Sequence, residues 1–276
     1  MSATTFTISM YLAIIPPIFL MWIIYKQDLI EHEPLGLVLQ AILLGCLVPV
    51  FVLLLDTPVY YFCTIFGTGI LYELADNFIR VALLEEGGKL LMFYLRIWKN
   101  KEFNYRFDAI IYSVAISVGF AAIENVMYVI NYGIETGILR AVTSIPGHVI
   151  FAIFMGHYLG EAKYRSILNH KASSDAYRRK ALWVPVLLHG TYDFICQRPE
   201  SYFSLFFWIF LIAIEILAIV KVYRNSRKDT ALAKPVIITR NVINEYELAL
   251  EEVRNHSQEE VDRQIAAKTI PSAEDI

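Results

Sequence analysis

The feature that most limits the fold of this chain is a succession of apolar stretches, each about as long as a bilayer is thick. A helix needs about 20 apolar residues to cross about 30 Å of hydrocarbon. We place seven such spans at roughly 6–25, 35–55, 77–97, 108–131, 141–162, 181–197 and 202–222. The 276 residues are 57% hydrophobic and 18% charged, whereas a soluble domain is about 45–50% apolar and about 25% charged. We therefore expect an all-α, polytopic membrane bundle of about seven transmembrane helices.

The basic residues alternate between connections and thereby predict the orientation. Lysine and arginine gather after spans three, five and seven, for example at Lys99, Lys101 and Arg106. The intervening connections hold few, such as Arg140 alone in 132–140. Because cytoplasmic loops carry the excess of positive charge, we expect the N-terminus outside and the C-terminus in the cytoplasm.

Two segments differ in composition from the spans. The segment 57–75 is aromatic and contains glycine, which favours a position at the membrane interface over a further crossing. The residues 224–276 form a polar tail, in which apolar residues recur at helical spacing among acids. We expect a transmembrane domain over 1–223, with a site-bearing core over 75–200, followed by a cytosolic tail that is partly an amphipathic helix.

Composition also argues against several classes. The net charge is only -3 and no basic patch interleaves with aromatic residues, so nucleic acid is not expected as a partner. The three cysteines are far apart and form no CxxC pair, which argues against a disulfide framework or a thiolate zinc site. The first apolar run lacks a basic leader and a small-residue cleavage site, so we expect a retained span in contact with lipid.

Ionisable residues inside the spans are the strongest functional signal, because their burial in a membrane is costly and rare. The main ones in the expected spans are Glu85, Glu86, Lys89, Glu124, His148, His189 and Asp193. His157 and Glu215 are also ionisable, but they match no partner by depth. We expect these two residues to lie outside any common site.

Depth counting brings four of these residues to one level. Consecutive spans run in opposite directions, so each position can be counted from the outer face. Glu85, Glu124, His148 and His189 then each lie about seven or eight residues from that face, which is about 10–12 Å at the helical rise. This agreement predicts one polar site built by four helices in the outer half of the membrane.

Local spacing supports the same site. Three pairs are four residues apart and therefore share a helix face: Glu85 with Lys89, Phe120 with Glu124, and His189 with Asp193. Lys89 can hold one carboxylate of the Glu85–Glu86 pair ionised. Asp193 can orient the ring of His189 through its second nitrogen.

Two further polar residues are expected to support the site. Asn125 borders Glu124 and can donate a hydrogen bond. Arg140, at the outer end of span five, can snorkel to the interface or hold a carbonyl or carboxylate of a substrate.

At these residues the chain resembles the PrsW-type membrane proteases. "EEGGK" (Glu85 to Lys89) matches their EExxK motif, "FAAIE" (Phe120 to Glu124) matches FxxxE, and "HGTYD" (His189 to Asp193) matches HxxxD. His148 takes the place of their single intramembrane histidine between the last two motifs. The order of the motifs also agrees, and the resemblance covers about residues 75–200.

The resemblance implies a bacterial, multi-pass enzyme of the plasma membrane, related to the CAAX-processing and bacteriocin-processing proteases. It implies hydrolysis of a peptide bond in a single-span membrane protein. The type of reaction that it suggests is the first cut in an anti-sigma factor. The motifs do not identify the substrate of this chain.

Two mechanisms are open for such a protease. In the first, Glu124, His148 and His189, with or without a carboxylate from span three, bind Zn²⁺ and its water, and Glu85 or Glu86 is the general base and later the acid. In the second, no metal is used: Glu85 or Glu86 activates water directly while the histidines stabilise the oxyanion. The spacing of the residues does not choose between them.

A different class of protein fits the same physics. Carboxylates and histidines at one depth can form the site of a proton- or cation-coupled transporter. Transporters often contain inverted repeats and bind near the midplane, and the sequence shows neither feature clearly. A non-catalytic receptor or scaffold that keeps the cavity is a third, weaker hypothesis.

Overall fold

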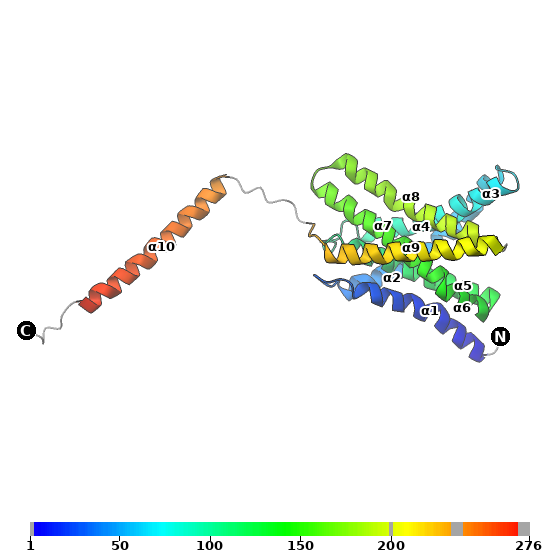
Figure 1. The fold of residues 1–276 in the computed structure, drawn as a ribbon, viewed down its shortest axis with the longest axis horizontal. Helices are drawn as coiled ribbons and strands as arrows, with labels where there is room; N and C mark the ends of the chain where they lie inside the picture. Colours follow the sequence, from blue (N-terminus) through cyan, green and yellow to red (C-terminus); the bar gives the residue numbers. More distant parts are fainter. Residues whose placement is uncertain (1–2, 199–200, 233–239, 270–276) are drawn as a thin grey trace, which may run out of the picture. The chain divides into compact units, whose positions relative to one another are not determined.

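The computed structural model describes residues 3–198, 201–232 and 240–269. The chain divides into two compact units, Met1–Ala233 and Lys234–Ile276. Helices account for the regular structure of the described residues in both units (Figure 1). The helices of the first unit are α1 (Ala3–Tyr25), α2 (Leu35–Thr64), α3 (Ile70–Ala75), η1 (Asp76–Leu83), α4 (Leu84–Arg96), α5 (Asp108–Tyr132), α6 (Ile134–Val142), α7 (Ser144–Ile167), α8 (Lys171–Cys196) and α9 (Ser201–Arg227).

Helix α5 is the centre of the first unit. It packs against α1, α2 and α7, while α7 also packs against α8 and α9. Every residue from Asp108 to Ala121 on α5 is buried, although a lone membrane helix would expose most of its surface to lipid. The outer helices present many exposed apolar side chains instead, which suits contact with hydrocarbon. An all-helical bundle is therefore confirmed.

Glycines allow two close helix crossings against α5. A Cβ atom at Gly119 of α5 would lie 1.9 Å from the backbone oxygen of Ile42 on α2, and one at Gly45 would lie 1.9 Å from the oxygen of Ile116. On α7, a Cβ atom at Gly156 would lie 2.5 Å from the oxygen of Ala109. Small residues at such crossings let helix backbones approach closely, which is a principal source of packing energy in membrane proteins.

Five stretches of the described residues are long and apolar enough to cross a membrane. They are Phe6–Tyr25, Leu35–Thr64, Asp108–Tyr132, Ile134–Ile167 and Ser204–Arg227. The two other expected spans, 77–97 and 181–197, are helical as well, but they carry the site's charges and are less apolar. Five crossings are thus supported by length and composition, and the count of seven stays a prediction.

The segment between the second and third expected spans differs from its prediction in its first half. Helix α2 does not end near residue 55 but continues to Thr64. The chain then turns and enters α3, which leads directly into η1 and α4. Together these three elements form a continuous helical run from Ile70 to Arg96, and η1 is a π-helix that ends just before Glu85. Wider π turns occur often at functional sites.

The second unit contains one described helix, α10 (Arg240–Thr269). Its side chains from 250 to 265 are exposed, and it is polar on average. The sequence predicts an amphipathic helix in this part of the chain, and a helix is present there.

Candidate active site

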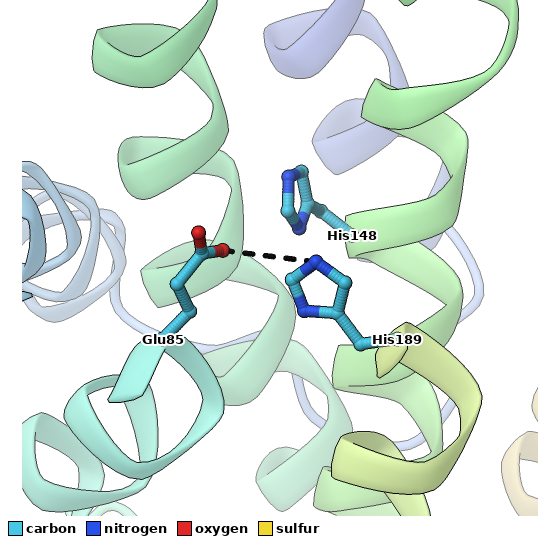
Figure 2. A group of neighbouring side chains, drawn as sticks. All are labelled: Glu85, His148 and His189. Carbon is cyan, nitrogen blue, oxygen red and sulfur yellow. Dashed lines mark ion pairs between the residues drawn. The ribbon is translucent and has the colours of Figure 1, made fainter. Parts of the chain in front are cut away.

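Four helices bring the ionisable residues together inside the bundle. Helix α4 supplies Glu85 and Glu86, and α5, α7 and α8 supply Glu124, His148 and His189 respectively. Glu86 is 0% exposed, His148 2% and His189 3%, although all three side chains are polar. Figure 2 shows the carboxylate of Glu85 and the imidazoles of His148 and His189 pointing toward one another. The depth agreement in the sequence therefore corresponds to a real convergence in space.

The ring of His189 lies between carboxylates on both sides. Its Nδ1 lies 3.1 Å from Oε1 of Glu86. Its Nε2 lies 3.3 Å from Oδ2 of Asp193 and 3.8 Å from Oε2 of Glu85. Glu86 thus takes the second ring nitrogen, the position expected for Asp193, and Asp193 approaches the nitrogen that faces Glu85. If Nδ1 carries the proton, Nε2 presents its lone pair to the carboxylate oxygens of Asp193 and Glu85. A second proton or a cation must then balance the negative charge of these carboxylates.

Lys89 lies between His148 and Glu86, the carboxylate that contacts His189. Its Nζ donates to Oε1 of Glu86 at 2.7 Å and lies 3.2 Å from Nδ1 of His148. It also lies 4.2 Å from the ring centroid of Phe120, whose ring is 5.2 Å from that of His148. With 1% of its side chain exposed, Lys89 is a fully desolvated countercharge for Glu86, and the FxxxE phenylalanine forms a wall beside both groups.

Glu124 is held by groups on two other helices. Its Oε2 lies 2.8 Å from Nε2 of His148 and 2.7 Å from Nη2 of Arg140 on α6. Arg140 Nε in turn donates to Oδ1 of Asn125 at 3.0 Å, and its guanidinium lies over the ring of Tyr128. Arg140 and Asn125 therefore both belong to the cluster, where they position Glu124.

The donor set suits a zinc ion. One carboxylate oxygen of Glu85 and one ring nitrogen each of His148 and His189 lie within 4.8 Å of one another. Oε2 of Glu85 is buried and has no hydrogen-bond partner, which is costly for a carboxylate unless a cation approaches. Two histidines with one glutamate form a familiar catalytic zinc set. This trio contains Glu85, a carboxylate of the third expected span, while Glu124 of the sequence-based set lies against His148.

The sequence did not point to two further neighbours of the histidines. Phe151 stacks on His189 with ring centroids 5.0 Å apart and an interplanar angle of 22°. The Ser117 hydroxyl donates to the backbone oxygen of His148 at 2.9 Å. Phe151 follows His148 by three residues and thus shares its helix face. This spacing could have predicted that Phe151 lies beside the histidines. Ser117 lies on another helix and gave no such signal.

A cavity of about 430 Å³ borders the cluster beside Asp193 and Arg140. Its wall also includes Thr143, Tyr192 and Arg198. The carboxylate of Asp193 and the guanidinium of Arg140 thus lie at the wall of a space about 430 Å³ in volume. His157 and Glu215 lie elsewhere, as expected: His157 contacts Asn225, and Glu215 lines a separate apolar groove.

Comparisons with known proteins identify the family. The sequence model of the family described as PrsW family intramembrane metalloprotease matches residues 33–219 of this chain. The chain is 35% identical to Protease PrsW of Oceanobacillus iheyensis, over 77% of this chain and 94% of the relative. It is 38% identical to Protease PrsW of Clostridioides difficile, over 67% and 77% of the two chains.

A further relative is Protease PrsW of Bacillus subtilis, which is 32% identical over 72% of this chain and 88% of its own. No solved structure matches. The family assignment favours a protease over a transporter for the buried Glu/His cluster. This multi-pass bacterial membrane protein therefore belongs to the PrsW family of intramembrane metalloproteases, and it is a protease.

Proposed function

We propose that this protease hydrolyses a peptide bond in a single-span, membrane-anchored protein of the bacterial plasma membrane, in the manner of a site-1 cut in an anti-sigma factor. The observation that carries the proposal is the convergence of Glu85, Glu124, His148 and His189 from four helices. A single-span helix can reach such a site laterally through the bilayer, and the cavity beside Asp193 can receive the segment that is cut.

We assign the two adjacent glutamates to different tasks. Glu86 is engaged by Lys89 and His189, so it positions the imidazole and balances the lysine. Glu85 forms no ion pair with a lysine or arginine of the described residues, and its Oε2 faces Nε2 of His189 at 3.8 Å, so we assign it the transfer of a proton from water to the leaving amine. His148 and His189 lie beside Glu85, so their imidazoles are the groups nearest to an oxyanion formed there.

The site also fits a metal, and the residues that would hold it are Glu85, His148 and His189. A bound zinc ion supplies Lewis acidity and lowers the pKa of its water. In that version Glu85 serves as a ligand. Glu124 then keeps its place between Arg140 and His148 and fixes the orientation of the imidazole.

The position of the cut follows from the orientation that the basic residues predict. With the N-terminus outside, the cluster lies in the outer half of the membrane. The proteolytic domain is then 1–223, and the tail from 224 is cytosolic. We expect the scissile bond just outside the membrane or within the outer-leaflet part of the substrate helix. Sequencing the new terminus of the product tests this, and a cut in a cytosolic segment would contradict it.

The function is tested by co-expressing the chain with a tagged single-span protein and following its fragments. Glu85→Gln is expected to lower the cleavage rate by about 10²–10⁴-fold, because it removes the proton acceptor or ligand but keeps the size of the side chain. Glu215→Gln is the matched control: it changes another intramembrane carboxylate that lies outside the cluster. Normal cleavage by Glu85→Gln would remove Glu85 from the mechanism.

A further inference from the structure

We call Glu85, Glu86, Glu124, His148 and His189 the proposed catalytic cluster. A second group of buried carboxylates lies outside it. Asp28 and Glu33 belong to the connection between α1 and α2, and Asp108 is the first residue of α5. They are 3%, 4% and 0% exposed respectively. One carboxylate oxygen from each lies within 4.8 Å of those of the other two. We call Asp28, Glu33 and Asp108 the acidic triad.

Hydrogen bonds hold the carboxylates of Asp108 and Glu33 in place. Asp108 Oδ2 accepts from the backbone N–H groups of Asn104 at 2.9 Å and Tyr105 at 2.7 Å. The hydroxyl of Tyr112 donates to Oε2 of Glu33. These bonds occupy one oxygen of Asp108 and one of Glu33 and hold both side chains in place. The remaining oxygens are left for one another or for a ligand.

Two oxygens of the triad are buried without any partner. They are Oδ2 of Asp28 and Oδ1 of Asp108. Among the ion pairs of the described residues, none involves a triad carboxylate, in contrast to Glu86 with its lysine and Glu124 with its arginine. Three carboxylates thus face each other with no Lys or Arg between them, an arrangement that needs positive charge from elsewhere.

The electrostatics of the loop agree with this need. Burial raises the pKa of Asp28 to about 6 and that of Glu33 to about 7. Three carboxylates this close together repel one another when ionised, and a bound cation would offset that repulsion.

We propose that the acidic triad binds a hard divalent cation, Mg²⁺ or Ca²⁺, through carboxylate oxygens from Asp28, Glu33 and Asp108. Oxygen ligands are the ones that these cations prefer, and water completes their coordination. The triad offers no sulfur or imidazole ligand that would select zinc. His32 is the nearest histidine along the chain, but its ring is exposed and stacks on Tyr25.

The cation would join two separate parts of the chain at one end of the bundle, and the segment after α9 is bonded to the residues just before α5. The triad joins the α1–α2 connection to the start of α5. Asp229, which follows α9, accepts from the N–H groups of Phe107 and Thr230 through Oδ1. Leu232 N also donates to Asn104 O at 2.6 Å. A cation at the triad therefore stabilises the packing of this end, independently of the protease chemistry.

Binding is tested directly on the purified full chain in detergent after metal removal. Tb³⁺ is the probe, because it occupies oxygen-rich cation sites and its emission is sensitised by a nearby tyrosine such as Tyr112. We expect tyrosine-sensitised emission that is displaced by Ca²⁺ or Mg²⁺, and the more effective competitor identifies the preferred ion. Emission should persist in His189→Ala, which separates this site from the catalytic cluster.

Thermal unfolding provides the second measurement. At a cation concentration about 100 times the Kd, the unfolding midpoint of the wild type is expected to rise by about 5–10 °C. Asp28→Asn and Asp108→Asn should lose most of this rise. Glu31→Gln is the matched control, because it removes an exposed carboxylate of the same loop, and it should retain the rise.

Three results would overturn the proposal: no sensitised emission with the wild type, an unchanged midpoint at saturating cation, or equal effects in the wild type and both triad variants. The test does not depend on the folding of any variant, because emission and midpoint are first measured on the wild type. It is also independent of cleavage, so the proposed function can fail while this site stands.

Discussion

The catalytic cluster and the acidic triad both bury carboxylates against α5, and they balance the charge in different ways. Glu124 in the cluster and Asp108 in the triad lie on the same helix, about 24 Å apart along its axis. The cluster contains its own cations, Lys89 and Arg140, together with two histidines. The triad contains only oxygen donors.

One helix, α5, thus contributes to two kinds of site. Where the sequence places Lys, Arg and His beside the acids, the carboxylates are oriented individually: Glu86 pairs with Lys89, Glu124 pairs with Arg140, and Glu85 faces His189. Where no base is supplied, the carboxylates converge and depend on an external ion. The composition of each group thus predicts different metals: zinc for the mixed cluster and a hard cation for the triad.

Metal removal is expected to have the largest effect. Stripping zinc from the purified protein should lower peptide cleavage by at least about 100-fold, because a catalytic ion supplies several kcal/mol of transition-state stabilisation. Zn²⁺ should restore cleavage, while Ca²⁺ or Mg²⁺ should restore only thermal stability. An active enzyme without bound metal would establish the glutamate-only mechanism instead.

Removing the internal cation of the cluster should be the next largest effect. Lys89→Met leaves Glu86 buried and uncompensated, and we expect a loss of about 3–5 kcal/mol in the free energy of unfolding. The double variant Glu86→Gln, Lys89→Met removes both charges and should recover much of that loss. Denaturant titration in detergent measures both. If the single variant is as stable as the double, the pair is not the desolvated contact described above.

A smaller effect is expected from the crossing of α5 with α2. Gly119→Ala would place a methyl group 1.9 Å from the backbone oxygen of Ile42, so the helices must separate. We expect a cost of about 1–3 kcal/mol, with a slower cleavage rate and an unchanged cation-dependent rise in the unfolding midpoint. Gly36→Ala is the control, since its Cβ would meet nothing within 4 Å. Equal losses in both variants would argue against the close crossing.

The smallest effect concerns the backbone of His148. Ser117→Ala removes the hydroxyl that donates to its carbonyl oxygen, which should cost about 1 kcal/mol. We expect about a fivefold lower kcat with little change in KM, because the imidazole shifts while the substrate cavity is untouched. Ser117→Thr keeps the hydroxyl and should recover part of the rate. A change confined to KM would place Ser117 at the substrate instead.

The amino-acid sequence was enough to predict a helical membrane bundle and the convergence of four ionisable residues. Apolar length predicted the bundle because a membrane imposes one helix length on each span. Depth counting found Glu85, Glu124, His148 and His189 because rise per residue is the same in every helix. The family motifs then predicted a protease, and the matches to known proteases confirmed that class of enzyme.

The tertiary structure decided which partner each ionisable group has. Glu86 and Lys89 are three residues apart and pair within α4 itself. Adjacent residues of a helix point about 100° apart, so the rotation of α4 against α8 decides that Glu86 contacts Nδ1 of His189 while Glu85 faces Nε2. The sequence did not predict the acidic triad either, because its members come from a loop and from the start of a distant helix. Local periodicity fixes the level of a side chain in a membrane, whereas its neighbours depend on helix rotation and packing, which only the assembled bundle defines.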